Sequence, residues 1–109
     1  MDTKELGRSV DGFEECSLSG DCDLYSAPAF ASEMIARLER GQRKLRFILR
    51  DLRYLDSTGV GAIIRILQTA RRLGGEIRFR GLGGSPRKVL EMSNIISIMI
   101  VEDGERAAK

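Results

Sequence analysis

The sequence predicts one α/β domain, in which a sheet carries helices on one face. Strand-like and helix-like segments alternate along its 109 residues, ending in a short helix and a last apolar segment. Such alternation is typical of a sheet whose strands are joined by right-handed helical crossovers. In the segment Glu76–Arg80, apolar and charged residues alternate strictly, which predicts that the other sheet face is at least partly open to water. A chain of this length is expected to form a single domain, residues 1–109.

The first half of the chain predicts two strands and a helix. Residues 1–12 show little pattern and predict a frayed or edge strand. The segment Phe13–Gly20 predicts a half-buried strand in which Cys16 and Leu18 share one face. A turn then leads into a helix with apolar side chains at helical spacing, for which Ser26 is the expected N-cap.

The second half supplies the most apolar strand candidate, Leu45–Arg50, and the best helix candidate, Val60–Leu73. Beyond the alternating strand, we expect a short helix that is capped by Ser85 and turns Met92 inward. Residues 95–101 predict a buried stretch or final strand, and residues 102–109 form a polar tail.

Charge and composition exclude several classes of protein. The chain has 18 basic and 16 acidic residues, a net charge of +2, whereas a nucleic-acid-binding protein usually shows a stronger, clustered basic excess. We therefore expect a solvated charged surface and no nucleic-acid partner. The sequence contains no apolar run long enough to span a membrane and no signal peptide, so no membrane association and a cytoplasmic location are expected.

The sequence contains no histidine and two cysteines, Cys16 and Cys22. Two thiols without histidine cannot form a four-ligand zinc site within one chain, so no metal is expected. Both cysteines occupy apolar positions of a predicted strand, which favours buried free thiols. The absence of histidine also removes the commonest general base and the usual partner of a nucleophilic serine.

The segment Tyr54–Gly61 joins the most apolar strand to the best helix. Its sequence, Tyr-Leu-Asp-Ser-Thr-Gly-Val-Gly, contains residues that cap helix N-termini and two glycines that allow close backbone approach. A hydroxyl beside a helix N-terminus is well placed to carry a phosphate, because the partial positive charge there stabilises the added negative charge. The alternative is an ordinary strand–turn–helix connection capped by serine or threonine.

The sequence resembles the STAS domains, and within them the bacterial anti-sigma factor antagonists. The segment 54–61 matches the family signature of an aromatic and an aliphatic residue followed by Asp-Ser-[Ser/Thr]-Gly-[Leu/Val]-Gly. Ser19–Asp23 matches a second family element, Gly-[Glu/Asp]-aliphatic-Asp, with Cys22 in the aliphatic position. The resemblance runs from about residue 13 to residue 102. It implies a mixed sheet of about four to five strands, packed on one side by about three to four helices.

The resemblance also implies a function and its residues. In this family the first hydroxyl residue after the motif aspartate, here Ser57, is phosphorylated by an ATP-binding partner that is both serine kinase and anti-sigma factor. The unphosphorylated domain binds that partner and frees the sigma factor, and a serine phosphatase resets the switch. The implied partner-binding residues are Asp23, Asp56, Ser57, Thr58 and Gly59. The resemblance implies neither cofactor nor enzymatic activity.

One position departs from the family pattern, and two other functions stay open. Ile48 stands nine residues before Ser57, where the family usually has Asp or Asn. A STAS module could instead serve as a scaffold, or bind a nucleotide or another partner without acting on a sigma factor. An enzyme with Ser57 as nucleophile is disfavoured, because an Asp-Ser pair without histidine is a poor activating arrangement.

We predict that the domain folds without metal or disulfide, because its length allows a sufficient core. A chelator combined with a reductant should leave the thermal unfolding midpoint essentially unchanged. A large decrease would show that Cys16 and Cys22 hold a bridge or a metal ion.

Overall fold

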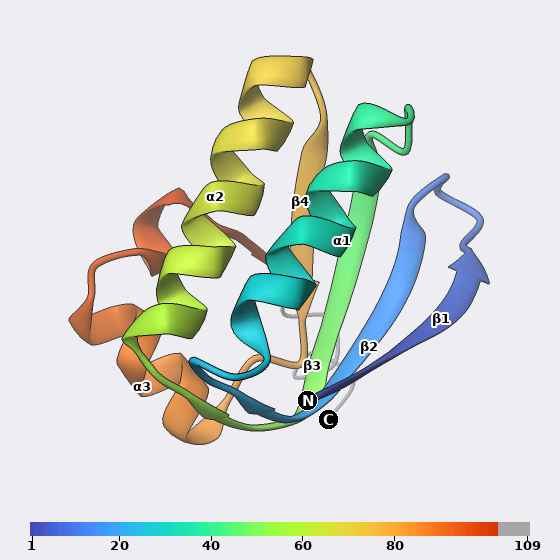
Figure 1. Ribbon diagram of the computed structural model, residues 1–109. Coiled ribbons are helices and arrows are strands. Elements are labelled where there is room, and N and C mark those ends of the chain that lie inside the picture. The colour runs from blue at the N-terminus through green and yellow to red at the C-terminus, as the bar shows by residue number, and fades with distance from the viewer. Residues whose placement is uncertain (103–109) are drawn as a thin grey trace.

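The computed structural model describes residues 1–102 and confirms the α/β class (Figure 1). The elements follow one another as β1 (Asp2–Arg8), β2 (Glu14–Cys22), α1 (Ala27–Glu39), β3 (Lys44–Leu55), α2 (Ser57–Leu73), β4 (Glu76–Arg80), α3 (Gly84–Met92), a 3-10 turn (Ile96–Ile98) and β5 (Ile100–Glu102).

The five strands form one mixed sheet in the order β1-β2-β3-β4-β5. The edge strand β1 is antiparallel to β2, and all the other neighbours are parallel. Helices α1 and α2 lie side by side over the same face of the sheet (Figure 1). Every residue of β1 is exposed, as expected of an edge strand.

The core lies between this sheet face and the helices. Phe47 of β3 lies at its centre, with its ring centroid 5.5 Å from that of Phe30 in α1 and 5.7 Å from that of Phe79 in β4. Cys16 and Leu18 are both buried on the same face of β2, as the alternation predicts. Most of the stability of the domain comes from removing this apolar surface from water.

Strand β3 and helix α2 are both longer than the sequence predicts. The strand runs to Leu55 instead of Arg50, and the helix begins at Ser57 instead of Val60. The pairing of β3 with β2 continues to the pair Cys22–Leu55, whereas β4 pairs with β3 only as far as Ile48. The second half of β3 therefore lacks a strand neighbour on one side, which explains why polar residues continue a strand that began as an apolar run.

Of three expected helix features, one is confirmed in position only and two are wrong. Ser26 occupies the N-cap position of α1, but its side chain makes no cap hydrogen bond to that helix. Helix α3 begins at Gly84 with Gly83 as its N-cap, so Ser85 lies inside the helix and caps nothing. Met92 is 87% exposed, and Pro86 and Leu90 are the residues that α3 buries. The helix starts two residues earlier than predicted, and Met92, its last residue, lies outside its buried face.

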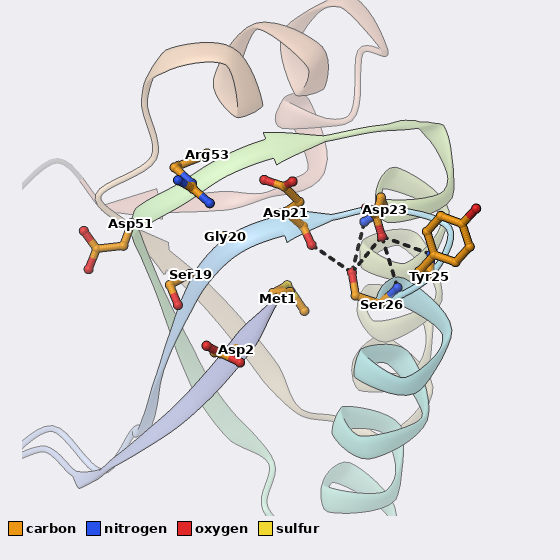
Figure 2. Close-up of a pocket in the computed structure, with 10 residues that line it drawn as sticks. All are labelled: Met1, Asp2, Ser19, Gly20, Asp21, Asp23, Tyr25, Ser26, Asp51 and Arg53. Atoms are coloured by element: carbon orange, nitrogen blue, oxygen red, sulfur yellow. Dashed lines mark hydrogen bonds between the residues drawn. The ribbon is translucent and has the colours of Figure 1, made fainter.

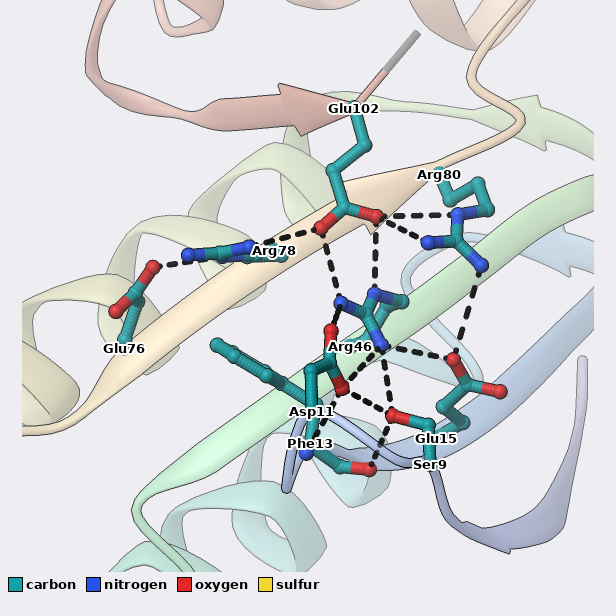
Figure 3. Close-up of polar contacts among 9 residues, drawn as sticks. All are labelled: Ser9, Asp11, Phe13, Glu15, Arg46, Glu76, Arg78, Arg80 and Glu102. Atoms are coloured by element: carbon teal, nitrogen blue, oxygen red, sulfur yellow. Dashed lines mark hydrogen bonds and ion pairs between the residues drawn. The ribbon is translucent and has the colours of Figure 1, made fainter. Parts of the chain in front are cut away.

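The open face of the sheet carries a network of ionic contacts that the sequence analysis took for a solvated surface (Figure 3). The side chain of Arg46 on β3 is only 2% exposed, and it pairs with Asp11, Glu15 and Glu102. Its guanidinium also stacks over the ring of Phe13, 4.8 Å from the centroid. Glu102, which was expected to open the polar tail, belongs to β5. Residues 103–109 of that tail lie outside the described residues.

All the N–H donors of Arg46 have acceptors, which explains how a buried charge is tolerated. Its Nε and Nη2 donate to the two oxygens of Glu102 at 2.9 and 3.0 Å, and Nη1 donates to Glu15 at 2.8 Å. Nη2 also donates to Asp11. Removing one partner of a buried ion pair typically costs about 3–5 kcal/mol, because the remaining charge is left without compensation.

We predict that acid weakens the fold through this network. The hydrogen bond from Arg46 lowers the pKa of Asp11 below its usual value of 3.8. Burial raises the pKa of Glu102, but hydrogen bonds from Arg46 and Arg78 outweigh it and leave that pKa below 4.5. At low pH the unfolded chain therefore binds more protons than the folded one, so stability should be full above about pH 5 and fall as the pH drops further.

Urea unfolding between pH 2 and pH 7 measures this effect. The Glu102→Gln variant should be less stable at pH 7 and lose less stability on acidification, because it lacks one of the titrating groups. Equal acid slopes for the variant and the wild type would contradict a role for Glu102.

Candidate functional site

The connections after β2 and β3 meet at the carboxyl edge of the sheet. The N–H of Asp56 donates to the carbonyl oxygen of Cys22 at 3.2 Å. This bond joins the first residue after β3 to the last residue of β2. Asp23, which follows Cys22, therefore lies on the same edge as Asp56 and Ser57, as the sequence analysis expects from the family pattern.

Helix α2 begins abruptly at this edge. Asp56 is its N-cap, and its Oδ1 accepts a hydrogen bond from the N–H of Gly59 at 3.0 Å. The carboxylate of Asp56, and not a serine or threonine hydroxyl, therefore caps the helix. Ser57 and Thr58 are both exposed in the first helical turn, so the Ser57 hydroxyl points to solvent at the positive end of a 17-residue helix.

Gly59 is required by the close packing of this turn on β2. A Cβ atom at Gly59 would lie 2.6 Å from the carbonyl oxygen of Cys22 and 2.5 Å from a methyl group of Leu55. The second motif glycine, Gly61, has no other atom within 4 Å of such a Cβ. Of the two glycines that were expected to allow close approach, Gly59 alone does so.

The thiol of Cys22 lies beneath the same turn and is buried. Burial raises its pKa to about 11, and the nearby carboxylates of Asp56 and Asp23 act in the same direction. The thiol therefore stays neutral at physiological pH and acts as an apolar packing group. The prediction that both cysteines are buried is confirmed, and both are free.

Asp23 organises the turn between β2 and α1 (Figure 2). Its Oδ1 accepts hydrogen bonds from the N–H groups of Tyr25 at 3.0 Å and of Ser26 at 3.2 Å. The Ser26 Oγ accepts the N–H of Asp23 at 3.1 Å and donates to the carbonyl oxygen of Asp21 at 2.8 Å, so it serves the preceding turn and not the free N–H groups of α1. Partial burial raises the pKa of Asp23, but these hydrogen bonds outweigh it and leave the pKa below its usual value. Asp23 is thus held as an anion.

Two hollows flank the turn. A polar one of about 750 Å³ is lined mainly by acidic and small residues, including Asp21, Asp23, Asp51 and Arg53 (Figure 2). A smaller groove of about 380 Å³ between the first turns of α1 and α2 is mostly apolar and includes Thr58 and Arg65. The site therefore combines anionic and apolar surface around an exposed hydroxyl, which suits a macromolecular contact better than a small substrate.

Sequence analysis missed the apolar side chains around the turn. Leu24, Tyr25 and Tyr54 are 56%, 86% and 47% exposed. Their exposure could have been predicted from the presence of large apolar residues within a turn and near the end of a strand. Ile48 lies elsewhere: it is buried in β3 between Ser17 and Arg80 of the neighbouring strands. The departure from the family pattern at this position therefore leaves the geometry of the Asp56–Ser57 turn unaltered.

Comparison with known proteins identifies the family. The profile of the STAS domain matches residues 10–108. The chain belongs to the STAS domain family. Among curated STAS-like relatives, the anti-sigma-B factor antagonist of Bacillus subtilis is 26% identical over 85 residues, which cover 78% of this chain and 77% of the relative. The anti-sigma-B factor antagonist of Staphylococcus aureus is 24% identical, over 86% of this chain and 87% of the relative.

Solved structures share the STAS fold. The anti-sigma factor antagonist SpoIIAA, in its unphosphorylated form, matches 98% of this chain and 94% of its own, with a TM-score of 0.72 and 14% identity. An anti-sigma factor antagonist from Mycobacterium paratuberculosis matches 92% of this chain and 85% of its own, with a TM-score of 0.73 and 20% identity. These likenesses confirm a mixed sheet of five strands with three helices as a STAS fold.

Residues 1–102 contain neither a membrane-spanning helix nor a cluster of metal-binding side chains. No described helix of this STAS domain is long and apolar enough to cross a membrane. Within the same range, no group of three or more Cys, Asp or Glu side chains is placed to hold a metal ion.

We predict opposite effects for alanine at the two motif glycines of the STAS signature. Gly59→Ala should destabilise the domain by about 1–3 kcal/mol, because the new methyl group overlaps the backbone of β2. Gly61→Ala adds the same methyl group to open space in the same helix, and should stabilise it by up to about 1 kcal/mol.

Denaturant unfolding of the two variants provides the comparison. The Gly61 variant is the matched control for helix propensity. Equal stability changes for both variants would show that the α2 turn does not pack against Cys22 as described.

Proposed function

We propose that this STAS domain is an anti-sigma factor antagonist, controlled as a partner switch by phosphorylation of Ser57. The observation that carries the proposal is the exposed Ser57 hydroxyl at the N-terminus of α2. It lies next to the helix-capping Asp56, on the same edge of the sheet as the turn that contains Asp23. The names of the curated relatives from Bacillus subtilis and Staphylococcus aureus support the antagonist function. The implied partner is an anti-sigma factor.

In this proposal the domain acts by binding and not by catalysis. Asp56 accepts the N–H of Gly59, and the sequence has no histidine that could activate Ser57. The proposed partner-binding residues are Asp23, Asp56, Ser57, Thr58 and Gly59, of which Gly59 is buried and acts by holding the turn in place. We assign the chemistry of the switch to two partners, an ATP-binding anti-sigma factor that phosphorylates Ser57 and a phosphatase that removes the phosphate.

The direction of the switch follows from where the phosphate would lie. On the free domain it is exposed at a helix N-terminus, where the helix favours it by about 0.3–1 kcal/mol. The negative charges of Asp56 and Asp23 oppose it, but water and salt screen exposed charges. In a complex the phosphate, with about −1.5 to −2 charges, is desolvated against the partner. An unpaired buried charge costs on the order of 3–5 kcal/mol, so the main effect falls on binding.

We predict that Ser57→Ala still binds the anti-sigma factor and that Ser57→Asp binds it roughly a hundredfold or more weakly. Both variants should melt near the wild-type temperature, because the Ser57 side chain makes no hydrogen bond within the described residues. Titration calorimetry with the ATP-binding anti-sigma factor of the same organism measures the affinities.

A charge control separates the position of the aspartate from its charge. Gln68 is exposed on α2 eleven residues from Ser57, roughly 16 Å along the helix. Gln68→Glu adds the same negative charge and should bind like wild type. Tighter binding by Ser57→Asp would reverse the direction of the switch. Equal weakening by Gln68→Glu would mean that net charge alone decides the affinity.

We also predict that the kinase modifies Ser57 and not Thr58. Mass spectrometry after reaction with ATP should place the phosphate on Ser57 in the wild type and in Thr58→Ala. Efficient phosphorylation of Ser57→Ala would sink this assignment. Binding of a partner that neither phosphorylates the domain nor binds a sigma factor would instead favour a scaffolding role.

A further inference from the structure

The open face of the sheet holds a second polar site, far along β3 from the Ser57 turn. Five N–H groups from three arginines meet at the carboxylate of Glu102 (Figure 3). Arg46 contributes Nε at 2.9 Å and Nη2 at 3.0 Å. Arg80 contributes Nε at 3.0 Å and Nη2 at 2.8 Å, and Arg78 contributes Nη1 at 3.3 Å. We call Arg46, Arg78 and Arg80 the arginine cradle.

The cradle and its occupant, Glu102, lie on different strands of the sheet. Arg46 lies on the central strand with its side chain 2% exposed, and Arg78 and Arg80 lie on the adjacent strand β4. Glu102 belongs to β5, which has three residues and pairs only with β4 among the described strands. Ile98 and Ile100, just before Glu102, are 61% and 47% exposed. Met99 and Val101 nevertheless pack against the core, so β5 is held both by these apolar contacts and by the Glu102 carboxylate.

The cradle accommodates an acidic group beyond those that already balance its charge. Asp11, Glu15 and Glu76 already balance the three arginines, since each of these carboxylates contacts at least one of them. The cradle nevertheless depresses the pKa of Glu102, with hydrogen bonds from Arg46 and Arg78 as the leading stabilising contacts. It therefore favours the charged form of a fourth acidic group. Without Glu102, the buried Nε–H and one Nη2–H of Arg46 would lack their acceptor. Because an unsatisfied buried donor costs free energy, binding of a replacement anion would be favoured.

We infer that the arginine cradle is a binding site for a small oxyanion, a carboxylate or phosphate group, which the chain's own Glu102 occupies in the described state. Convergent guanidinium groups bind the oxygens of carboxylate and phosphate through paired N–H donors. An external oxyanion competes with Glu102 for the same donors. Its binding displaces the Glu102 carboxylate, so that ligand occupancy and docking of Glu102 are mutually exclusive.

The test vacates the cradle without touching the Ser57 site. Glu102→Ala should bind inorganic phosphate or acetate, with titration by NMR chemical shifts of β3 and β4 as the readout. Wild type should bind the same probes roughly tenfold or more weakly, because a tethered carboxylate competes at an effective concentration in the millimolar range. Phosphate and acetate form separate arms and show which of the two oxyanions the cradle prefers.

Two controls make the result specific. Glu76→Ala removes a carboxylate that contacts Arg78 at 2.7 Å but leaves Glu102 in place, and it should not gain binding. The double variant Glu102→Ala with Arg80→Met should lose the binding that the single variant gains. Potassium chloride at matched ionic strength controls for general screening of charge.

The inference can still be tested when the Glu102→Ala variant does not fold in plain buffer. Refolding by phosphate or acetate, but not by chloride, would support the cradle as an oxyanion site. A variant that neither binds these oxyanions nor refolds in their presence would overturn the inference, as would equal binding by wild type and Glu102→Ala. The Ser57 variants test a different edge of the sheet, so failure here leaves the proposed switch intact.

Discussion

The close approach of the first turn of α2 to the end of β2 is the constraint on which the Ser57 site depends. One backbone hydrogen bond, from Asp56 to Cys22, joins the two strand ends, and Gly59 leaves room for it. The carboxylate of Asp56 accepts the N–H of Gly59 and so stabilises the backbone of the turn itself. The exposed hydroxyl beside it is consequently held by rigid neighbours without taking part in their contacts. A surface residue that can be modified without disturbing the fold needs such neighbours, which are held in place by contacts that do not include it.

The molecule handles its charges differently at its two polar centres. At the carboxyl edge of the sheet, Asp23 is stabilised by backbone N–H groups and Asp56 by a helix terminus, so neither depends on a positively charged side chain. On the open face, Arg46 is stabilised by three carboxylates from two distant parts of the chain, residues 11–15 and Glu102. Contacts between charged side chains are weakened by salt, whereas hydrogen bonds from backbone N–H groups involve no positively charged side chain. The two centres can therefore be altered independently.

The sequence predicts the elements well where periodicity or a motif is strong. Strict alternation in Glu76–Arg80 and the spacing in α1 locate the core, and the Asp-Ser-Thr-Gly motif locates the start of α2 to within three residues. The extension of β3 to Leu55 was missed, because pairing with β2 continues through residues that carry no apolar pattern. The burial of Arg46 was missed for a related reason: its partners lie 31 to 56 residues away. Local pattern cannot reveal contacts over such distances in sequence.

The exposure of Ser57 has a consequence for how fast the site can respond. The Ser57 side chain is exposed in the first turn of α2 and makes no hydrogen bond within the described residues. A modifying enzyme can therefore reach it without any prior opening of the fold. Its reactivity is then set by encounter and not by a conformational equilibrium of the domain.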